Sequence, residues 1–326
     1  MPADKKILIT TYHNAFLNKG GGEYELLEVA LNLRKMGHIA DVYSPYSRSV
    51  QYYDIIIHFS VEEGGLGLLR HVKSEGKKVI LWPNLWVESH DRDRVKKVAA
   101  AHLDLADAVV FKSRTEEKKF KSVAWQDNTR SIIVPAGVDP SFAQAAPSRL
   151  FRSSYGLDTY LLWVGIIEPT KNQLSTIEAL ADFDLPLVIV GDYRDKEYYA
   201  QCRAAAPEHF LFLDPIAHNS DLIRSAMQEC RLYIETSLDP PGKSVIEAAI
   251  AGAPLLVRES AWAREHFGDA AFYLNADDAG SIREGIERTL DVPKKQVLRN
   301  DLMKKHLFPD VLSPLTQLIA ELTQER

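Results

Sequence analysis

The chain has 326 residues, of which 46% are hydrophobic and 26% are charged, and its formal net charge is −6. This is the composition of a soluble folded protein long enough for two domains of about 150 residues each. It excludes a membrane-spanning helix, because no apolar run approaches the roughly 20 residues that cross a bilayer. The two cysteines, Cys202 and Cys230, form no motif, and the N-terminus has no signal-peptide pattern. We therefore expect a reduced, cytoplasmic protein.

The charge is unevenly distributed along the chain. Residues 1–150 hold 21 Lys and Arg against 18 Asp and Glu, whereas residues 151–326 hold 18 against 27. The first half contains two basic runs, at 92–97 and 112–121. Such runs are usually solvated helix faces. The alternative is contact with an anionic surface, which would place the protein peripherally at the inner membrane face. We expect no nucleic-acid partner.

Short β-branched runs alternate with helical stretches, a pattern typical of a parallel α/β sheet. In the first half, strands are expected at 6–10, 39–43, 54–58, 78–82, 108–111 and 131–134. In the second half, they are expected at 160–164, 187–190, 210–213, 232–235, 255–257 and 272–274. This count predicts two Rossmann-like halves, joined through the linker-like composition of residues 139–154.

A glycine turn, Gly20-Gly21-Gly22, follows the first expected strand, where the backbone could approach a ligand closely. It does not have the G-x-G-x-x-G spacing of dinucleotide-binding enzymes, so an NAD enzyme is disfavoured. Glu23 follows the turn. Its carboxylate could face a ligand or could simply complement the helix dipole.

Polar and aromatic residues at two other strand ends are further candidates. His13 follows the first strand, and Asn84 and Trp86 follow the fourth. Trp86 could stack on a sugar, and ordinary packing is the alternative. A lone histidine is more often structural than catalytic.

The most informative stretch runs from 234 to 254. A strand-like run leads into a Pro/Gly turn, and a helix opens at Gly242, Lys243, Ser244 and Val245. A helix N-terminus leaves backbone N–H groups free to bind phosphate. Glu247, slightly deeper in the same helix, could accept hydrogen bonds from ribose hydroxyls. The stretch therefore indicates a nucleotide site at the carboxyl end of a parallel strand.

Two other motifs in the chain are weaker. Gly242-Lys243-Ser244 suits a phosphate-binding Walker A loop only if a glycine precedes Gly242 by five residues, and the chain has Ser237 there. Asp91-Arg92-Asp93 spells the D-x-D of metal-dependent transferases, but it opens a basic helix instead of following a strand. There is no Cys/His cluster, so we expect no metal site.

The 234–254 stretch resembles the E-x7-E region of retaining GT-B glycosyltransferases, most closely glycosyltransferase family 4. Asp239 takes the first Glu position, and Glu247 matches the second. Other segments match this family in order: Gly20–Glu23, Ala106–Val110, Val134–Asp139, and Val164-Gly165 with Lys171-Asn172. The sequence departs from the family at Ile166, where an Arg is usual, and in the turn before Ser244.

The resemblance implies a GT-B fold, with two Rossmann-like domains facing across a central cleft and the last helix crossing back to the first domain. Residues 1–145 with helix 311–326 would form the acceptor-side domain, and residues 150–308 the nucleotide-sugar-binding domain. The implied activity is metal-independent, retaining hexosyl transfer without a cofactor. The donor would be a nucleotide sugar, with UDP slightly preferred over GDP. The acceptor would be a glycan or a lipid-linked sugar in polysaccharide biosynthesis.

The resemblance also implies roles for individual residues. Lys171 would bind the donor diphosphate, Asp239 would approach the donor sugar, and Glu247 would bind the ribose. Lys243 could supply the charge missing at Ile166, or it could point to solvent. The donor site would be completed by Gly165 and by two loops holding the base, at Gly191 and Ile216.

Two alternatives to a transferase stay open at this point. One is a GT-B enzyme of another kind, such as a UDP-sugar epimerase. The other is a catalytically degenerate binding or scaffold subunit, which the changes at Ile166 and Asp239 would suit.

Overall fold

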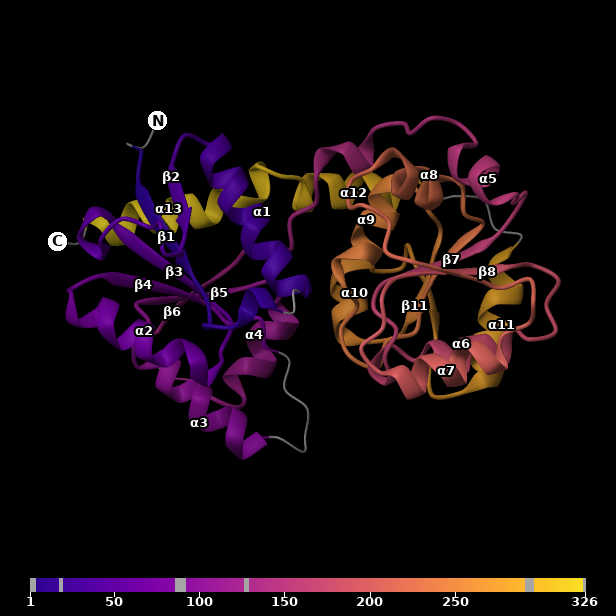
Figure 1. Ribbon diagram of the computed structural model, residues 1–326, viewed down its shortest axis with the longest axis horizontal. Coiled ribbons are helices and arrows are strands. Elements are labelled where there is room, and N and C mark those ends of the chain that lie inside the picture. Colours follow the sequence, from indigo (N-terminus) through magenta and orange to yellow (C-terminus); the bar gives the residue numbers. More distant parts are fainter. Residues whose placement is uncertain (1–3, 18–19, 86–91, 126–128, 291–295, 325–326) are drawn as a thin grey trace. The chain divides into compact units, whose positions relative to one another are not determined.

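The computed structural model describes residues 4–17, 20–85, 92–125, 129–290 and 296–324. The chain divides into two compact units. Unit 1 comprises Met1–Gly137 and His306–Arg326, and unit 2 comprises Val138–Lys305. Each unit contains a six-stranded parallel sheet (Figure 1), which confirms the two α/β halves predicted from the sequence.

The sheet of unit 1 has the strand order β2-β1-β3-β4-β5-β6, with every neighbouring pair parallel. Its strands are β1 (Lys6–Thr10), β2 (Ile39–Val42), β3 (Ile55–Phe59), β4 (Lys78–Trp82), β5 (Ala108–Phe111) and β6 (Arg130–Ile133). Its helices are η1 (Ala15–Leu17), α1 (Gly21–Lys35), η2 (Val50–Tyr52), α2 (Glu63–Ser74), α3 (Arg92–Leu103), α4 (Arg114–Lys121), η6 (Asp310–Leu312) and α13 (Ser313–Gln324).

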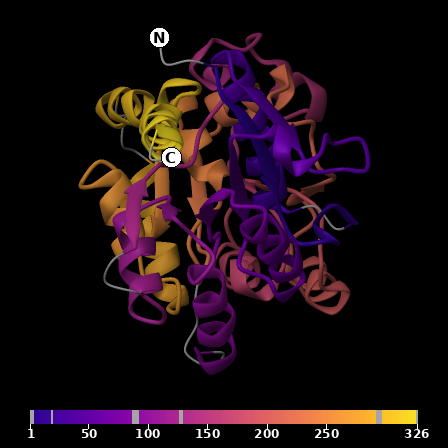
Figure 2. The same cartoon turned by 90° about the vertical axis from the view of Figure 1, so that its left-hand side faces the viewer.

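Helices cover both faces of this sheet, as a parallel sheet requires. Alternate strand residues point to opposite faces. Ile7 and Ile9 pack with α1 and α13, whereas Leu8 packs with α2 on the other side. The C-terminal helix therefore belongs to the core of unit 1, although unit 2 separates it in sequence from the rest (Figure 2).

The sheet of unit 2 has the strand order β12-β11-β10-β7-β8-β9. Its strands are β7 (Leu161–Val164), β8 (Leu187–Val190), β9 (Leu211–Leu213), β10 (Leu232–Glu235), β11 (Leu255–Arg258) and β12 (Phe272–Leu274). Its helices are η4 (Pro140–Ala143), α5 (Leu150–Tyr155), η5 (Pro169–Lys171), α6 (Gln173–Ala179), α7 (Lys196–Ala205), α8 (Asp221–Glu229), α9 (Lys243–Ala251), α10 (Ala261–Phe267), α11 (Ala279–Leu290) and α12 (Gln296–His306).

The strand order of unit 2 reverses at β7. The chain moves from β7 to β8 and β9 on one side, and β10, β11 and β12 follow on the other. In open parallel sheets, ligands bind outside the carboxyl ends of the strands at such a reversal. The edge where β7 and β10 end is therefore the place to look for a site.

The division between the units falls earlier in the chain than the composition suggested. Residues 138–145 belong to unit 2, because Phe142 of η4 is buried there and the Ser141 carbonyl accepts a hydrogen bond from Arg224 of α8. Across the part of the chain that the structure describes, no helix is both long and apolar enough to pass through a bilayer.

Candidate functional site

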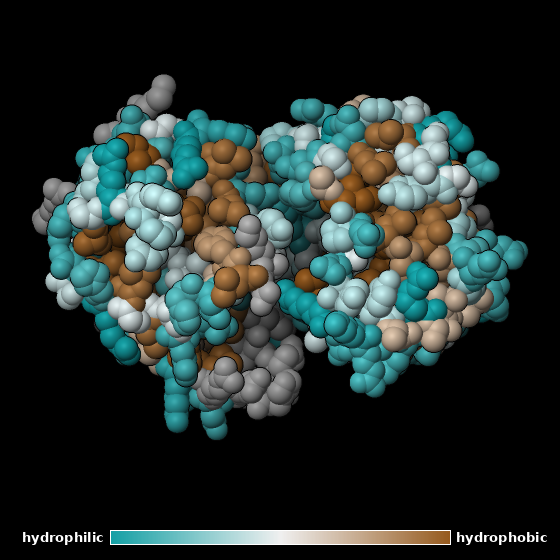
Figure 3. Space-filling model, viewed as in Figure 1, coloured by the Kyte–Doolittle hydropathy of each residue, from teal (hydrophilic) through white to brown (hydrophobic). Residues whose placement is uncertain are grey.

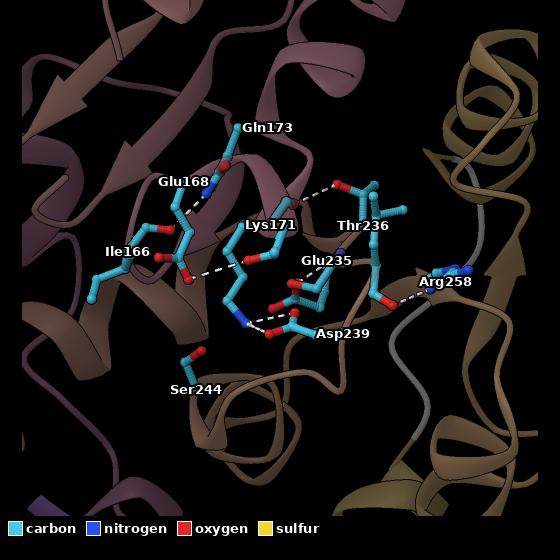
Figure 4. A network of polar contacts seen from close by, with 12 residues as sticks. Ile166, Glu168, Lys171, Gln173, Glu235, Thr236, Asp239, Ser244 and Arg258 are labelled. Atoms are coloured by element: carbon cyan, nitrogen blue, oxygen red, sulfur yellow. Dashed lines mark hydrogen bonds and ion pairs between the residues drawn. The ribbon is translucent and has the colours of Figure 1, made fainter. Parts of the chain in front are cut away.

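The candidate site lies at the carboxyl edge of the unit 2 sheet, where β7 and β10 end. Four segments meet there: the turn from β7 into α6, the end of β8, the turn after β10, and the N-terminus of α9. Figure 4 shows side chains of the first, third and fourth of these segments.

Two glycines allow the ends of β7 and β8 to come close together. The Gly165 amide donates to the Val190 carbonyl at 2.9 Å, and a Cβ atom on Gly191 would lie only 1.8 Å from the Gly165 carbonyl oxygen. Only glycine fits at position 191 without moving this backbone. Gly165 and Gly191, both predicted as donor-site residues, therefore shape the edge itself.

Lys171 and Asp239 form an ion pair at this edge. The Lys171 ammonium lies 2.8 Å and 2.9 Å from the two Asp239 carboxylate oxygens (Figure 4). The side chain of Lys171 is 16% exposed and that of Asp239 is 32% exposed. The structure thus brings together two of the predicted catalytic residues, in a pairing that the sequence did not predict.

Backbone and hydroxyl contacts hold the turns that carry this pair. The Leu238 amide donates to the Thr170 carbonyl at 2.8 Å, and the Thr236 and Thr176 hydroxyls lie 2.9 Å apart. The turn after β10 is therefore fastened to the turn after β7, which fixes the approach of Lys171 to Asp239.

Glu247, the third predicted catalytic residue, lies almost fully buried on α9. Its side chain is 4% exposed; its Oε1 accepts a hydrogen bond from His218 Nε2 at 2.8 Å and lies 3.3 Å from the Lys243 ammonium. Burial acts to raise the pKa of Glu247, but the His218 hydrogen bond and the Lys243 charge outweigh it, so the pKa is lowered. Glu247 is therefore held as a carboxylate, able to accept hydrogen bonds.

The first turn of α9 contains the other predicted donor-site residues. Ser244 donates its hydroxyl to the Val164 carbonyl at 2.9 Å, which ties the helix N-terminus to the end of β7. Val245 is fully buried in the core, and Gly242 is the N-cap. Lys243 is 21% exposed and points toward Glu247, so its ammonium lies within the site.

Two residues of this site were not foreseen from the sequence. His218 follows β9 and reaches Glu247 from 29 positions away in the chain. Glu235, at the end of β10, is 2% exposed and accepts hydrogen bonds from the Ser237 amide and hydroxyl. Burial raises the pKa of Glu235, against the effects of Ser237 and Lys171. Glu235 could have been identified from the sequence, because it is an acidic residue at the end of an otherwise apolar strand. No comparable sequence feature marks His218.

Ile216 lies in a hollow beside the same sheet, at the end of β9. The hollow has a volume of about 630 Å³, within the range of small-molecule sites. It is lined by Tyr155, Phe212, Leu213, Asp214, Pro215, Ile216, Ala217, Ser220 and Leu222. Its mixture of aromatic, aliphatic and polar groups suits a nucleobase.

In unit 1, the side chain of Glu23 forms hydrogen bonds with residues close to it in the chain. Its two carboxylate oxygens accept hydrogen bonds from the Gly20 amide at 2.7 Å and the Tyr12 hydroxyl at 3.0 Å. Glu23 therefore caps its own helix. Gly21 is exposed, whereas a Cβ on Gly22 would lie 3.1 Å from Asn84 Nδ2.

Asn84 and His13 are two further acceptor-side candidates. Both amide atoms of Asn84 are buried and have no hydrogen-bond partner among the described residues. His13 lines a separate hollow of about 420 Å³ at the ends of β1 and β2, with Tyr12, Phe16 and Tyr43. Trp86 lies outside the described residues.

Three cations of the basic run at 112–121 form ion pairs within unit 1. The Lys112 ammonium lies 3.4 Å from Glu25, and both Arg114 and Lys121 pair with Glu117. In the run at 92–97, the side chains of Arg92 and Arg94 lie outside the described part of the structure. Within the described residues, no group of three or more His, Cys, Asp or Glu side chains could hold a metal ion.

No protein-family model matches the chain, and no curated protein matches its sequence. Solved structures do match its fold over nearly its whole length. Sucrose-phosphate synthase from Thermosynechococcus elongatus superimposes with a TM-score of 0.80 at 14% identity, covering 99% of this chain and 100% of that one. HepE from Anabaena, solved in complex with UDP, gives 0.78 at 18% identity, covering 97% and 100%. A trehalose-6-phosphate protein from E. coli, bound with UDP-2-fluoro glucose, gives 0.70 at 11% identity, covering 98% and 100%.

These similarities establish the architecture. Two six-stranded parallel sheets with interleaved helices form the fold of GT-B glycosyltransferases, as the sequence predicted. At identities of 11–18%, the similarity shows the fold alone, and the activity has to be argued from the site.

Proposed function

We propose that this protein is a glycosyltransferase that moves a hexosyl group from a nucleotide sugar, with UDP preferred over GDP, to a sugar hydroxyl of a glycan or a lipid-linked acceptor. We further propose that transfer retains the anomeric configuration and needs neither a metal ion nor a cofactor.

One observation carries this proposal. At the reversal of the unit 2 sheet, the Lys171–Asp239 pair and the buried Glu247 with its partners His218 and Lys243 lie around one helix N-terminus. This arrangement supplies positive charge for a diphosphate and a carboxylate for a ribose. The nucleotide complexes of HepE and of the E. coli protein support the choice of UDP.

In the proposed reaction, the acceptor hydroxyl oxygen bonds to the anomeric carbon while the bond from that carbon to the β-phosphate oxygen breaks. The hydroxyl proton passes to the departing phosphate oxygen. Lys171, Lys243 and the α9 N-terminus would neutralise the negative charge that develops on the diphosphate. Glu247 would orient the ribose, and Asp239 would contact the donor sugar.

A catalytically degenerate binding subunit is the second candidate. The observation that favours it is the combination of Ile166, where the family has an Arg, with a Lys171 already paired to Asp239. Such a protein would bind nucleotide weakly and would not turn it over. A UDP-sugar epimerase would turn over its nucleotide sugar with no acceptor present.

The test is a calorimetric titration with a panel of nucleoside diphosphates and nucleotide sugars, with and without a chelator, followed by assays of donor hydrolysis and isomerisation. The proposal expects selective UDP binding that is insensitive to the chelator and is lost in Glu247→Ala. Glu259→Ala, a surface acid of unit 2, is the matched control. Weak or absent nucleotide binding without turnover of any donor would contradict the proposal and favour the degenerate subunit. Isomerisation without an acceptor would favour the epimerase.

A further inference from the structure

Exposed apolar side chains are concentrated in one short part of unit 1. Among the described residues, ten large apolar side chains are exposed, and eight of them fall between residues 16 and 46. These eight are Phe16, Leu17, Tyr24, Leu27, Leu31, Ile39, Tyr43 and Tyr46. They lie on η1, α1, β2 and the segment after β2. Contiguous apolar surface that stays exposed on a folded domain often marks an interaction site.

The outward face of helix α1 carries three of these side chains. Tyr24, Leu27 and Leu31 are spaced three and four residues apart, so they share one face, and they are 56%, 38% and 48% exposed. Figure 3 shows hydrophobic surface where α1 runs. The opposite face of α1 is also apolar, with Leu26 and Leu33 buried in the core. A helix that is apolar on both faces is normally covered on both.

The charges on α1 determine what could cover the outward face. Its exposed charged residues, Arg34 and Lys35, both stand in the last turn, and Arg34 Nε donates a hydrogen bond to the Ala40 carbonyl at 2.6 Å. Glu23 and Glu25 are buried, and Glu28 is half-buried. A helix face that is apolar along its length and cationic at its end is complementary to a surface with an apolar interior and anionic groups on its outside.

We propose that the outward face of α1 docks on the surface of an anionic lipid bilayer. The helix lies in the plane of the interface, with Leu27 and Leu31 in the boundary between headgroups and acyl chains and Tyr24 at headgroup depth. Arg34 and Lys35 face the lipid phosphates. The outer face of a single helix is convex, a shape that a fluid lipid surface accommodates without a preformed groove.

This proposal places the membrane contact away from the run at 112–121, where three cations are already paired inside unit 1. It does not depend on the proposed glycosyl transfer. A protein that binds no nucleotide could still dock through α1, so the two proposals can fail separately.

The experiment is co-sedimentation of the full chain with vesicles of phosphatidylcholine alone and of phosphatidylcholine with phosphatidylglycerol. We expect binding to the anionic vesicles, weakened by salt. The double variant Leu27→Gln/Leu31→Gln should bind at least 10-fold more weakly, and Lys35→Gln should reduce the preference for anionic vesicles. Tyr193→Ser, which alters an exposed aromatic side chain of unit 2, is the matched control and should bind like the parent.

Circular dichroism melting of each variant separates loss of docking from loss of folding. Because Leu27 and Leu31 are partly exposed, the double variant should melt within a few degrees of the parent. The proposal would be overturned if the parent did not bind anionic vesicles, or if the parent and the double variant bound equally. A concentration-dependent dimer that the double variant abolishes, without vesicle binding, would also overturn it, because a second copy would then be the occupant.

Discussion

Glu247 shows how a single buried carboxylate can be both a structural and a binding group. It sits between His218 and Lys243 with almost no contact with solvent. An ionised group survives burial only when it is paired and hydrogen-bonded, and here both partners come from the candidate site. A ligand hydroxyl that reaches Glu247 therefore enters a network that already exists.

Replacing Glu247 with Gln should weaken UDP binding at least 10-fold and lower the free energy of unfolding by about 1–3 kcal/mol, because the Lys243 ammonium loses its anion and the hydrogen bond from His218 loses its charged acceptor. Calorimetry and urea unfolding measure the two effects. Glu259→Gln removes a 59% exposed acid paired with Arg264 and should change stability by less than about 1 kcal/mol. Equal UDP affinity in the two variants would show that Glu247 does not contact the ligand.

A substitution at Lys171 can separate the effect of the ammonium charge on ligand binding from the effect of side-chain volume. Lys171→Met keeps most of the side-chain volume but removes the ammonium from Asp239, so we expect a loss of roughly 10- to 100-fold in UDP affinity. Affinity for uridine, which has no phosphate, should change less than about threefold. Arg283→Met, at an exposed surface pair with Asp182, is the control. A parallel loss for uridine and UDP would place Lys171 outside the diphosphate site.

At the scale of elements, the ends of β7 and β8 can lie close together because position 191 is a glycine and has no side chain. Gly191→Ala should lower the free energy of unfolding by about 2 kcal/mol or more, because its Cβ would overlap the Gly165 carbonyl. Gly21→Ala, in the first turn of α1 with open space around it, should be neutral or stabilising. Denaturant unfolding compares the two. A neutral Gly191→Ala would mean that the strand ends separate at little cost.

Strand β3 contains a buried histidine that links stability to pH. Burial and the neighbouring His102 lower the pKa of His58 to about 3. His58 takes up a proton near pH 6.5 in the unfolded chain but not in the folded one. Its contribution to the free energy of unfolding is therefore complete above pH 6.5 and is lost as the pH falls toward 3. Over this range the free energy of unfolding falls by up to about 1.4 kcal/mol per pH unit because of this one histidine.

We therefore expect the free energy of unfolding to fall between pH 7 and 5, with a shallower fall in His58→Gln. Urea unfolding at several pH values measures both slopes. His71→Gln, on the exposed side of α2, controls for the substitution itself. An unchanged slope in His58→Gln would mean that His58 takes up its proton in the folded protein too.

The elements were largely predictable, because each strand of a parallel sheet is a short buried run of β-branched and aliphatic residues bounded by polar turns. Each of the twelve expected strands is present, within one residue of its expected bounds. The site was predictable only as a set of residues. Lys171 and Asp239 are 68 positions apart, and their pairing depends on how two loops leave adjacent strands. No local pattern contains that information, and the same holds for His218.

At the scale of the whole molecule, unit 1 depends on a helix from the other end of the chain. Helix α13 contributes four side chains to its core: Leu315, Leu318, Ile319 and Leu322. At about 1.5–3 kcal/mol for each buried side chain, this contribution is comparable to the entire stability of a small domain.

A chain ending at residue 309 should therefore lose the fold of unit 1 while unit 2 stays folded. Limited proteolysis should leave a resistant fragment close to Val138–Lys305, and UDP titration should still report the unit 2 site. The control is a chain ending at residue 324, which keeps α13. Loss of both units together would show that unit 2 requires unit 1 to fold.

The return of α13 to unit 1 also sets an order of events during synthesis on the ribosome. The first sheet emerges early, but its covering helix is made only after the 168 residues of Val138–Lys305. At a translation rate of 5–20 residues per second, synthesis of unit 2 takes roughly 10–30 s. During this time one apolar face of the unit 1 sheet is incompletely covered. Unit 2 is continuous in sequence and can fold during that interval. Within this chain, the sheet that is made first is thus completed after the unit that is made second.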